Sequence, residues 1–465
     1  MTLPFRAREA AAWAGAALVR GDAESTFTSV SIDTRTLAPG ALFVAIRGEN
    51  HDAHAFVANA LASGAAGVLV EHADAVPADA RVPVLVARDS TRALGALAAG
   101  HRASFRGPVV AITGSNGKTT TKEMCAAILG ELGPCLATQG NLNNQFGLPL
   151  TLLRRGAAHR TLVVELGMNH RGEIAPLAAI ARPTIGVITT IGTAHIEFLG
   201  SREAIAEEKG DLVAALPPDG VAVLPGDDAL ARAQAKRCRA RVVFFGRSAD
   251  CEVRPEDVRA EGDSFAFRVV APQGETALRV AGLGEPTVSN ALAASAACLA
   301  AGASLAELAA GLARYAPAKG RMQRVRLASG AVVIDDTYNA NPQSMQAALE
   351  SLVRLRGAGR AFAVLGDMGE LGAHAEAGHR SVGALAGELR VDALYALGEH
   401  AALVREAALA GGLTAERTHV AASHDEIAAA LRNVLRAGDV ALVKGSRSMR
   451  MERVVEALTG TKGDH

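Results

Sequence analysis

Several kinds of residue are scarce in this sequence. Its 465 residues include only five cysteines, and none forms a C-x-x-C pair, so neither a disulfide framework nor a zinc site is indicated. Aromatic residues make up only 3%, and Lys+Arg and Asp+Glu are equal at 48 each. This leaves no basic, base-stacking surface for nucleic acid and no net charge to attract the chain to anionic membranes. The composition therefore argues against a disulfide-rich, a zinc-binding or a nucleic-acid-binding protein.

Long apolar runs are also missing. The first residues, MTLPFRAREAAAWAG, place Arg6, Arg8 and Glu9 where a signal peptide needs an unbroken apolar segment. The most apolar stretch, residues 291–313, is rich in alanine and is interrupted by a glycine and a glutamate, which favours two packed helices over a membrane span. We therefore expect a protein of the reducing cytoplasm with no membrane span.

The length and the order of apolar segments predict three α/β domains. A typical domain has about 150 residues, so this chain is too long to fold around a single core, and its length suggests three domains. Short strands and helices alternate in residues 1–107, and the apolar strands of 108–318 alternate with helical stretches, which predicts a mainly parallel sheet there. Residues 319–465 contain five strand–helix pairs in a Rossmann-like pattern, but no G-x-G-x-x-G follows the first strand, so a dinucleotide is not inferred.

The most informative stretch is residues 111–129, AITGSNGKTTTKEMCAAIL. Its G-x-x-G-K-T is two residues shorter than the common P-loop pattern. An apolar strand precedes it and a helix is expected from Lys118, so the loop's backbone N–H groups lie at a helix N-terminus, which favours a phosphate. Lys118 adds a positive charge, and Thr119 a hydroxyl able to hold Mg²⁺. An ordinary strand–turn–helix with a solvated lysine is the alternative, but the surrounding pattern favours the phosphate site.

Two further strand ends carry polar residues. Glu165 ends the strand in TLVVELG, and His195 follows the strand in IGVITTIG. Ligand-facing residues collect at such carboxyl ends in open α/β sheets, so with Thr119 these two residues form a candidate set of metal ligands. Taken singly, Glu165 could be a helix-capping or solvated acid, and His195 a hydrogen-bonded structural histidine. Lys209 lies in EAIAEEKGDL, a helical pattern that by itself predicts a surface lysine paired with a glutamate.

Together these motifs resemble the Mur ligase family. ITGSNGKTTTKEM is similar to the family's ATP loop, which has this shortened form, and SIDTRTLAPGALFVAIRG resembles the start of its UDP-binding domain. NLNNQFGLPLTLL and ELGMNHRGEI resemble central-domain motifs, and GRMQ marks the start of the C-terminal domain. DDTYNANPQSM, LGDMGELG and VKGSRSMRMERVV resemble the members that join D-Ala-D-Ala to UDP-N-acetylmuramoyl-tripeptide. The resemblance covers nearly the whole chain.

The resemblance implies both a fold and an activity. The fold is a small α/β UDP-binding domain, a P-loop-like ATPase domain with a mainly parallel sheet, and a Rossmann-like ligase domain. The activity is ATP-dependent peptide-bond formation through an acyl phosphate, with ADP and phosphate released, in a monomer that serves peptidoglycan synthesis. Two alternatives stay open: a ligase of the same family with another acceptor, and a nucleotide- or muropeptide-binding protein without catalysis.

The resemblance also implies roles for single residues. ATP contacts are implied for Gly114, Ser115, Asn116, Gly117, Lys118, Thr119, Thr120, Asn290, Arg321 and Asp336. Mg²⁺ ligands are implied to be Thr119, Glu165, His195 and Lys209, the last carbamylated by CO₂. The implied catalytic residues are Lys118, Glu165, His195, Lys209 and Arg321. Carbamylation makes chemical sense because it replaces a cation with a carboxylate-like anion able to ligate Mg²⁺.

Substrate contacts follow in the same way. The residues implied to hold the UDP-linked substrate are Ser31, Asp33, Thr34, Arg35, Asn143 and Asn144. Those predicted to meet D-Ala-D-Ala, because they follow a strand's carboxyl end, are Tyr338, Asn339 and Asn341. The candidates for the base that takes the amine's proton are His374, His379 and the reaction's own phosphate.

Two positions depart from the family's pattern. Pro225 stands where the family often has the first residue of Asn-x-Asp-Asp, and Pro286-Thr287 stands where it often has His-Asn. Both positions lie on the adenine side in the family. We therefore expect altered nucleobase contacts with unchanged phosphate chemistry.

Overall fold

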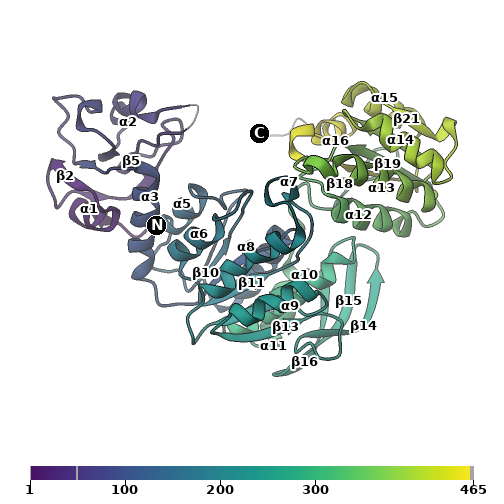
Figure 1. Cartoon of the computed structure of the whole chain (residues 1–465), viewed down its shortest axis with the longest axis horizontal. Helices are drawn as coiled ribbons and strands as arrows, with labels where there is room; N and C mark the ends of the chain where they lie inside the picture. Colours follow the sequence, from purple (N-terminus) through teal and green to yellow (C-terminus); the bar gives the residue numbers. More distant parts are fainter. Residues whose placement is uncertain (1, 49–50, 461–465) are drawn as a thin grey trace.

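The computed structural model describes residues 2–48 and 51–460. Figure 1 shows three α/β units in chain order, with the N-terminal and C-terminal units on opposite sides of the central one. Each unit has its own main sheet of five or six strands with helices packed against it. The predicted fold class is confirmed. Within the described residues, every helix falls short of the length or the apolar character that a membrane span requires.

The N-terminal unit has a sheet of order β2-β7-β6-β5-β4, parallel except at β2. Its strands are β2 (Ala17–Arg20), β4 (Ser29–Ser31), β5 (Ala41–Val44), β6 (Gly67–Val70) and β7 (Val84–Val86), and a second pair is formed by β1 (Phe5–Arg6) and β3 (Thr26–Phe27). Its helices are α1 (Ala7–Ala14), α2 (Val57–Ala62) and α3 (Ser90–Ala103). Helix α3 contacts α5 and α6 of the central unit and so joins the two units.

The central unit has an all-parallel sheet of order β13-β12-β11-β8-β10-β9. Its strands are β8 (Val109–Thr113), β9 (Cys135–Ala137), β10 (Thr161–Glu165), β11 (Ile185–Ile188), β12 (Val221–Pro225) and β13 (Arg241–Phe245). Strands β9 and β10 lie on one side of β8, whereas β11 to β13 lie on the other, so the strand order reverses at β8. Ligands bind at the carboxyl ends of strands around such a reversal.

The helices of the central unit cover its sheet. They are α4 (Lys118–Leu129), α5 (Gly147–Leu153), α6 (Ile174–Ala181), α7 (Ile196–Leu199), α8 (Arg202–Ala214), α9 (Ala229–Gln234), α10 (Pro286–Ala300) and α11 (Leu305–Arg314). The expected helix starting at Lys118 is present, and the alanine-rich stretch forms two packed helices, α10 and α11, as predicted.

A small antiparallel sheet beside α10 was not predicted. Its strands are β14 (Arg254–Glu261), β15 (Ser264–Ala271) and β16 (Gly274–Ala281). Along β15, burial alternates, and Phe265, Phe267 and Val269 pack in the same core as the buried face of α10. This alternation is the normal signature of a half-buried strand and was present in the sequence.

The C-terminal unit has a sheet of order β17-β18-β22-β19-β20-β21. The predicted strands are β18 (Val332–Asp336), β19 (Ala361–Gly366), β20 (Ala393–Leu397), β21 (Thr418–Val420) and β22 (Val440–Lys444), and all are parallel. Strand β17 (Gln323–Arg326) adds an antiparallel edge that was not predicted. The helices are α12 (Pro342–Leu355), α13 (Ala375–Glu388), α14 (Ala401–Ala410), α15 (His424–Val434) and α16 (Glu452–Thr459).

Candidate active site between the central and C-terminal units

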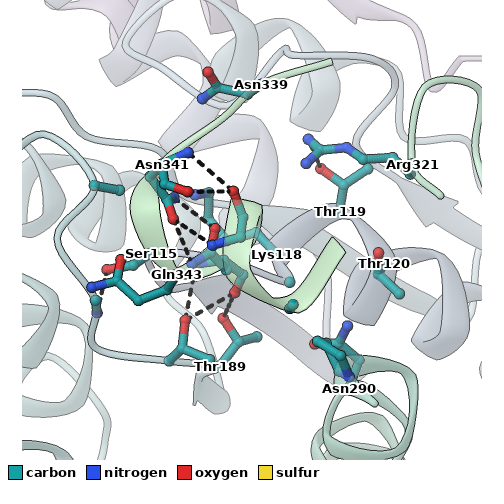
Figure 2. Close-up of a pocket in the computed structure, with 18 of the residues that line it drawn as sticks. Ser115, Lys118, Thr119, Thr120, Thr189, Asn290, Arg321, Asn339, Asn341 and Gln343 are labelled. Carbon is teal, nitrogen blue, oxygen red and sulfur yellow. Dashed lines mark hydrogen bonds between the residues drawn. The ribbon is translucent and has the colours of Figure 1, made fainter. Parts of the chain in front are cut away.

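A cavity of about 950 Å³ lies where the carboxyl ends of β8, β10 and β11 face the C-terminal unit. Most of the predicted site residues line it: Ser115, Asn116, Gly117, Lys118, Thr119, Thr120, Asn143, Asn144, Glu165, His195, Asn290, Arg321, Asp336, Tyr338, Asn339 and Asn341. Six predicted residues lie outside its lining: Gly114, Lys209, Ser31, Asp33, Thr34 and Arg35. Figure 2 shows part of this lining around the loop after β8.

The two glycines of the loop are required by close packing. Gly114 has φ 152°, and a Cβ there would lie 1.8 Å from the hydroxyl of Thr189. Gly117, with φ 82°, precedes α4, and a Cβ there would lie 2.2 Å from the side-chain oxygen of Asn290. Because both positions are left-handed and crowded, only glycine fits them without strain. The shortened loop therefore has a defined, closely packed conformation that brings its N–H groups to the start of α4.

Lys118 places its ammonium group inside this loop. Its Nζ donates to the backbone carbonyl of Gly114 at 2.8 Å. Burial lowers the pKa of Lys118, the nearby carboxylates of Glu165 and Glu370 raise it, and the charge of Arg321 lowers it further. A cation in such a setting favours an anion, because a phosphate would offset the cost of its burial.

Glu165 and Thr119 come together as predicted. Glu165 is 2% exposed at the end of β10, and its Oε2 accepts from the Thr119 hydroxyl at 3.1 Å. Its Oε1 accepts from the Asn143 side-chain amide at 2.8 Å. A buried carboxylate beside a hydroxyl, next to a phosphate-binding loop, fits Mg²⁺, which takes few protein oxygens and completes its shell with phosphate oxygens and water.

The C-terminal unit contributes Arg321 to the same place. Its Nη2 donates to the Thr119 hydroxyl at 3.2 Å, and its guanidinium lies 3.9 Å from the centre of the Tyr338 ring. Asp336 accepts from Lys444 Nζ at 2.6 Å. Lys444 was missed in the sequence analysis, although it belongs to the VKGSRSMRMERVV motif. The arrangement brings positive charge from two units to one cavity.

Amide side chains also join the two units. Asn341 Nδ2 donates to Asn116 Oδ1 at 2.8 Å, and the reverse contact is 3.3 Å (Figure 2). The hydroxyl of Thr193 donates to Gln343 Oε1 at 2.7 Å. Asn341 therefore contacts the loop after β8, whereas its predicted contact with D-Ala-D-Ala stays a prediction.

His195 occupies an unusual backbone conformation just before α7. Its φ is 63°, and its Nδ1 lies 2.6 Å from Glu370 Oε2 of the C-terminal unit. This contact lowers the pKa of the Glu370 carboxyl. Within the described residues, His195 makes no hydrogen bond to Thr119 or Glu165, so the structure brings it to the cavity but not directly onto them. Glu370 was missed, although it stands in the LGDMGELG motif.

Lys209 is buried in α8, and the pattern-based expectation of a surface lysine is therefore wrong. It is 1% exposed, and in the part of the chain that the structure describes its Nζ has no hydrogen bond or ion pair. The neighbouring Glu208 carboxylate is committed to the backbone N–H groups at the start of α6, those of Gly172, Glu173 and Ile174, at 2.7–2.9 Å. Burial first, and then the charge of Lys118, hold the pKa of Lys209 well below its usual range.

The residues predicted for the uridine nucleotide lie on the N-terminal unit, at the end of β4 and directly after it. The Ser31 hydroxyl donates to the Asp33 carbonyl at 2.9 Å, and Arg35 Nη2 lies 2.6 Å from Asp33 Oδ2. Hydrogen bonds from Arg35 lower the pKa of Asp33 to about 2. The Arg35 side chain is 86% exposed, so its guanidinium is accessible to a phosphate. These residues keep their predicted role as a proposal.

The two prolines that depart from the family pattern both line the cavity and suit their local structure. Pro225 ends β12, and Pro286 is the first residue of α10, a position that needs no backbone N–H. Asn290, one turn further along α10, accepts from the Thr121 hydroxyl at 3.4 Å. The two histidines considered as bases, His374 and His379, lie outside the cavity lining.

Family models match the chain along its length. The “Mur ligase middle domain” matches residues 112–298, the “Mur ligase, glutamate ligase domain” residues 320–447, and the “Mur ligase family, catalytic domain” residues 26–102. A relative from Escherichia coli (strain K12), named UDP-N-acetylmuramoyl-tripeptide–D-alanyl-D-alanine ligase, is 37% identical over 438 residues, which are 94% of each chain. The chain belongs to the Mur ligase family.

Solved structures of Mur ligases have the same three-unit fold. The structure named MurF from Acinetobacter baumannii superposes on this Mur ligase with a TM-score of 0.90 at 34% identity, covering 99% of this chain and 100% of that one. MurF ligase from Thermotoga maritima, solved in complex with ADP, superposes with a TM-score of 0.81 at 28% identity, covering 93% and 97%. Both matches include all three units.

Proposed function

We propose that this Mur ligase joins D-Ala-D-Ala to UDP-N-acetylmuramoyl-tripeptide, with ATP converted to ADP and phosphate, to form the pentapeptide precursor of peptidoglycan. The whole-length similarity to relatives with that name supports the substrates. The observation that carries the chemistry is the meeting of Lys118, Thr119 and Arg321 from two units around one cavity. The proposal places the protein in the cytoplasm, since both ATP and the nucleotide-linked substrate belong to that compartment, and it expects a monomer.

The chemistry explains why this site needs so much positive charge. A carboxylate cannot be attacked by an amine directly, because oxide is not a viable leaving group. Transfer of the γ-phosphoryl group of ATP to the tripeptide carboxylate gives an acyl phosphate, and the D-Ala-D-Ala amine then displaces phosphate. The first step brings two anions together, and Lys118 and Arg321 are placed to offset that repulsion.

Thr119 and Glu165 are the residues that would hold Mg²⁺. When bound, Mg²⁺ supplies further charge neutralisation at the phosphate oxygens. The Asn143 amide fixes the Glu165 carboxylate on its other oxygen, so the carboxylate keeps one orientation. Holding both substrates between two units can also contribute about 7–11 kcal/mol through positioning, and it keeps water from the acyl phosphate.

Lys209 is the residue that would form a carbamate. Its lowered pKa favours the neutral amine, which is the form that reacts with CO₂. In that reaction an N–C bond forms and the amine loses a proton, so the product is an anion. A carbamate anion on Lys209 would be attracted by the charge of Lys118, the same charge that lowers the pKa of the unmodified amine, and this supports the modification.

The test is phosphate release from ATP and Mg²⁺ with UDP-N-acetylmuramoyl-tripeptide, with and without D-Ala-D-Ala. The proposal expects release only when both substrates are present, with the pentapeptide detected by mass spectrometry. Turnover with a different amine alone would make the protein a ligase with another acceptor. Bound ATP without turnover for any amine would make it a nucleotide-binding protein.

A further inference from the structure

The motif LGDMGELG, residues 365–372, has no part in the chemistry described so far, although it is one of the motifs that carry the resemblance. It leaves the end of β19 and crosses toward α7 of the central unit. A short helix, Gly372–His374, begins at the last residue of the motif and contacts α7. We call residues 367–372 the docking loop.

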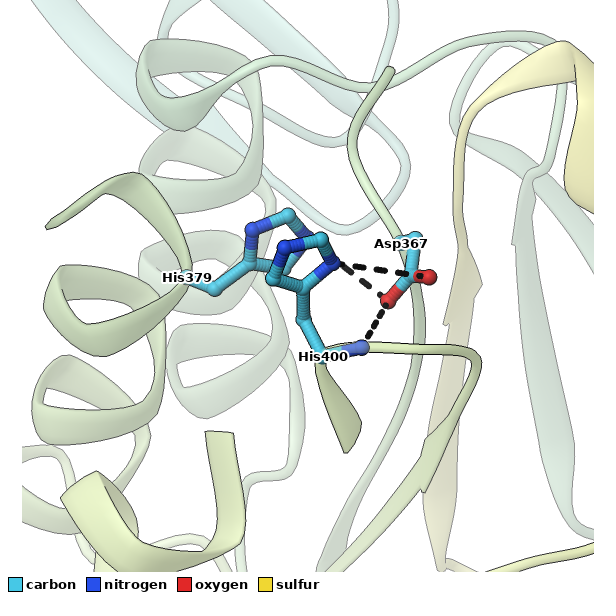
Figure 3. A group of neighbouring side chains, drawn as sticks. All are labelled: Asp367, His379 and His400. Atoms are coloured by element: carbon cyan, nitrogen blue, oxygen red, sulfur yellow. Dashed lines mark hydrogen bonds and ion pairs between the residues drawn. The ribbon is translucent and has the colours of Figure 1, made fainter. Parts of the chain in front are cut away.

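The base of the docking loop is anchored by a cluster of Asp367, His379 and His400 (Figure 3). The Asp367 carboxylate accepts the backbone N–H groups of Glu399 and His400 at 2.7 and 3.2 Å. The buried His379 ring accepts the Met368 N–H at Nε2, 2.9 Å away, and contacts the Ala375 carbonyl through Nδ1 at 2.7 Å. The His379 and His400 rings stack at 4.1 Å.

This cluster holds the loop rather than a metal ion. Its ligand atoms lie within 4.8 Å of one another, but both nitrogens of His379 already have backbone partners. A cation would have to displace the Met368 N–H, which would then be buried without a partner. The same contacts leave His379 no free nitrogen to act as a base in the cavity. The cluster therefore fixes the direction in which the loop leaves β19.

The tip of the loop reaches His195 in the central unit. Glu370 Oε2 lies 2.6 Å from His195 Nδ1, a contact at ion-pair distance although not in the geometry of a linear hydrogen bond. The Glu370 carbonyl accepts the Glu197 N–H at 3.3 Å. A Cβ on Gly372 would lie 2.9 Å from the Glu197 side chain, so the loop is pressed closely against α7.

Both residues of this contact have left-handed backbones. Glu370 has φ 59° and His195 has φ 63°. Such conformations are costly for residues other than glycine, and they persist where the surrounding structure requires them, often at functional sites. Here one such residue lies on each side of the boundary between the two units. This indicates that both units hold their backbone in the conformation that the contact needs.

We propose that Glu370 is a positioning residue that orients His195 in the phosphate cavity when the C-terminal unit docks. His195 lines the cavity, whereas Glu370 belongs to the other unit, so the pair exists only when the units are together. The charge of Glu370 also acts on Lys118 in the same cavity. A carboxylate behind a histidine is a common way to orient the ring toward a metal or a phosphate. This inference rests on the proposed function.

The test compares Glu370→Gln, which keeps the shape and removes the charge, with Glu376→Gln as the matched control. Glu376 is an exposed acid of α13 in the same unit, and its partner is Arg380. For Glu370→Gln we expect kcat to fall about 10- to 100-fold, the usual cost of losing such a supporting group, with less than about a threefold change in the KM for ATP. Glu376→Gln should keep wild-type kinetics.

Histidine side-chain NMR supplies a readout that does not need turnover. With selectively labelled protein, the His195 signals, assigned from a His195→Gln variant, should shift in Glu370→Gln and stay in place in Glu376→Gln. A fall in kcat with unmoved His195 signals would overturn the inference, and so would a kcat within twofold of wild type. Thermal unfolding of each variant checks that the fold is kept.

A double variant tests whether Glu370 acts through His195. If Glu370 acts through His195, the loss in His195→Gln/Glu370→Gln should be close to that of His195→Gln alone, whereas independent losses that multiply would overturn the inference. Wild-type protein is assayed first. Wild type that lacks ligase activity would contradict the proposed function, and the NMR comparison would still decide whether Glu370 orients His195.

Discussion

Lys118 and Lys209 of the central unit show how the same side chain takes different roles in different surroundings. Burial lowers the pKa of both. For Lys118, the carboxylates of Glu165 and Glu370 offset part of this lowering, because their negative charge favours the charged form of the lysine. The carboxylate that raises the pKa of Lys209 is that of Glu208, which is already bound to backbone N–H groups. Lys118 therefore suits phosphate binding, and Lys209 suits reaction with CO₂.

Lys118→Ala should lower kcat by at least about 100-fold, the order seen on losing one preorganised charge-stabilising group. The reason is that no other cation in the loop replaces its charge beside Gly114. Phosphate-release kinetics measure the loss. Lys236→Ala, at an exposed lysine away from the cavity, is the control and should behave as wild type. Activity of Lys118→Ala within a few-fold of wild type would contradict the role given to this lysine.

Lys209→Ala should also be slow, but for a reason that can be reversed chemically. The variant lacks the amine that would carry the carbamate, and small carboxylates can enter the space it leaves. We expect acetate or formate to restore part of the activity, measured by phosphate release over a range of carboxylate concentrations. Lys118→Ala serves as the control that carboxylates should not rescue. Full activity in Lys209→Ala without any additive would show that no carbamate is needed.

At the scale of elements, helix α12 links fold stability to the site. Asn341 is its N-cap, since its side-chain oxygen accepts the Ser344 N–H at 2.9 Å. The same side chain donates through Nδ2 to Asn116 in the loop after β8. One residue therefore ends the preceding loop, starts the helix and ties the helix to the other unit. These tasks use different atoms, so substitutions can separate them.

Asn341→Ala should lower stability by about 1 kcal/mol through loss of the cap, and it should also reduce activity. Asn341→Asp keeps a capping oxygen but loses the Nδ2 donor, so stability should stay near wild type while activity falls. Scanning calorimetry and steady-state kinetics on both variants measure the two effects. Equal activity of Asn341→Asp and wild type would mean that the contact with Asn116 has no part in the reaction.

At the scale of the whole molecule, the outer units are attached to the central one in different ways. The N-terminal unit is joined through α3, where the buried Arg102 donates to the carbonyls of Phe105, Ala181 and Arg182 at 2.8–3.0 Å. The C-terminal unit is held by polar side-chain pairs, many of them around the cavity. Hydrogen bonds around an open ligand cavity exchange with water more easily than those of the buried Arg102, so we expect the C-terminal unit to be the one that moves during the reaction.

The stability of the N-terminal unit should fall in acid. His101 on α3 packs near Phe5 and Trp13, and its two ring nitrogens have no partner within the described residues. Burial, followed by the charge of Arg155, lowers the pKa of His101 from 6.5 to about 4. The unfolded chain therefore takes up the proton first. The stability from the neutral ring is complete above pH 6.5 and is lost between pH 6.5 and about 4.

This group alone can account for at most about 3 kcal/mol over that range. His101→Phe should flatten the decrease in melting temperature between pH 6.5 and about 4, because the ring can no longer take up a proton. Thermal unfolding across this range measures the slope. His419→Gln, at an exposed histidine of β21, is the control and should keep the wild-type slope. An unchanged slope in His101→Phe would assign the acid sensitivity to other groups.

Local patterns in the sequence were enough to predict the α/β class, the parallel strands and the phosphate loop. The reason is that strand and helix periodicity, and the glycines at positions 114 and 117, depend on neighbours a few residues away. The carboxyl ends of parallel strands meet at one edge, so Glu165 and Thr119 could also be placed together from the sequence. The domain boundaries and the roles of single residues stay predictions.

Only the tertiary structure decided the contacts between distant segments. The burial of Lys209 depends on what packs over α8, whereas the glutamates beside it in the sequence pointed to the surface. The pairs His195–Glu370 and Asn116–Asn341 join residues 175 and 225 positions apart, and such pairs depend on how two units dock. The sequence by itself therefore determined the elements and their chemistry, whereas the tertiary structure determined which charges are buried and which side chains meet, because burial and docking follow from packing across the whole chain.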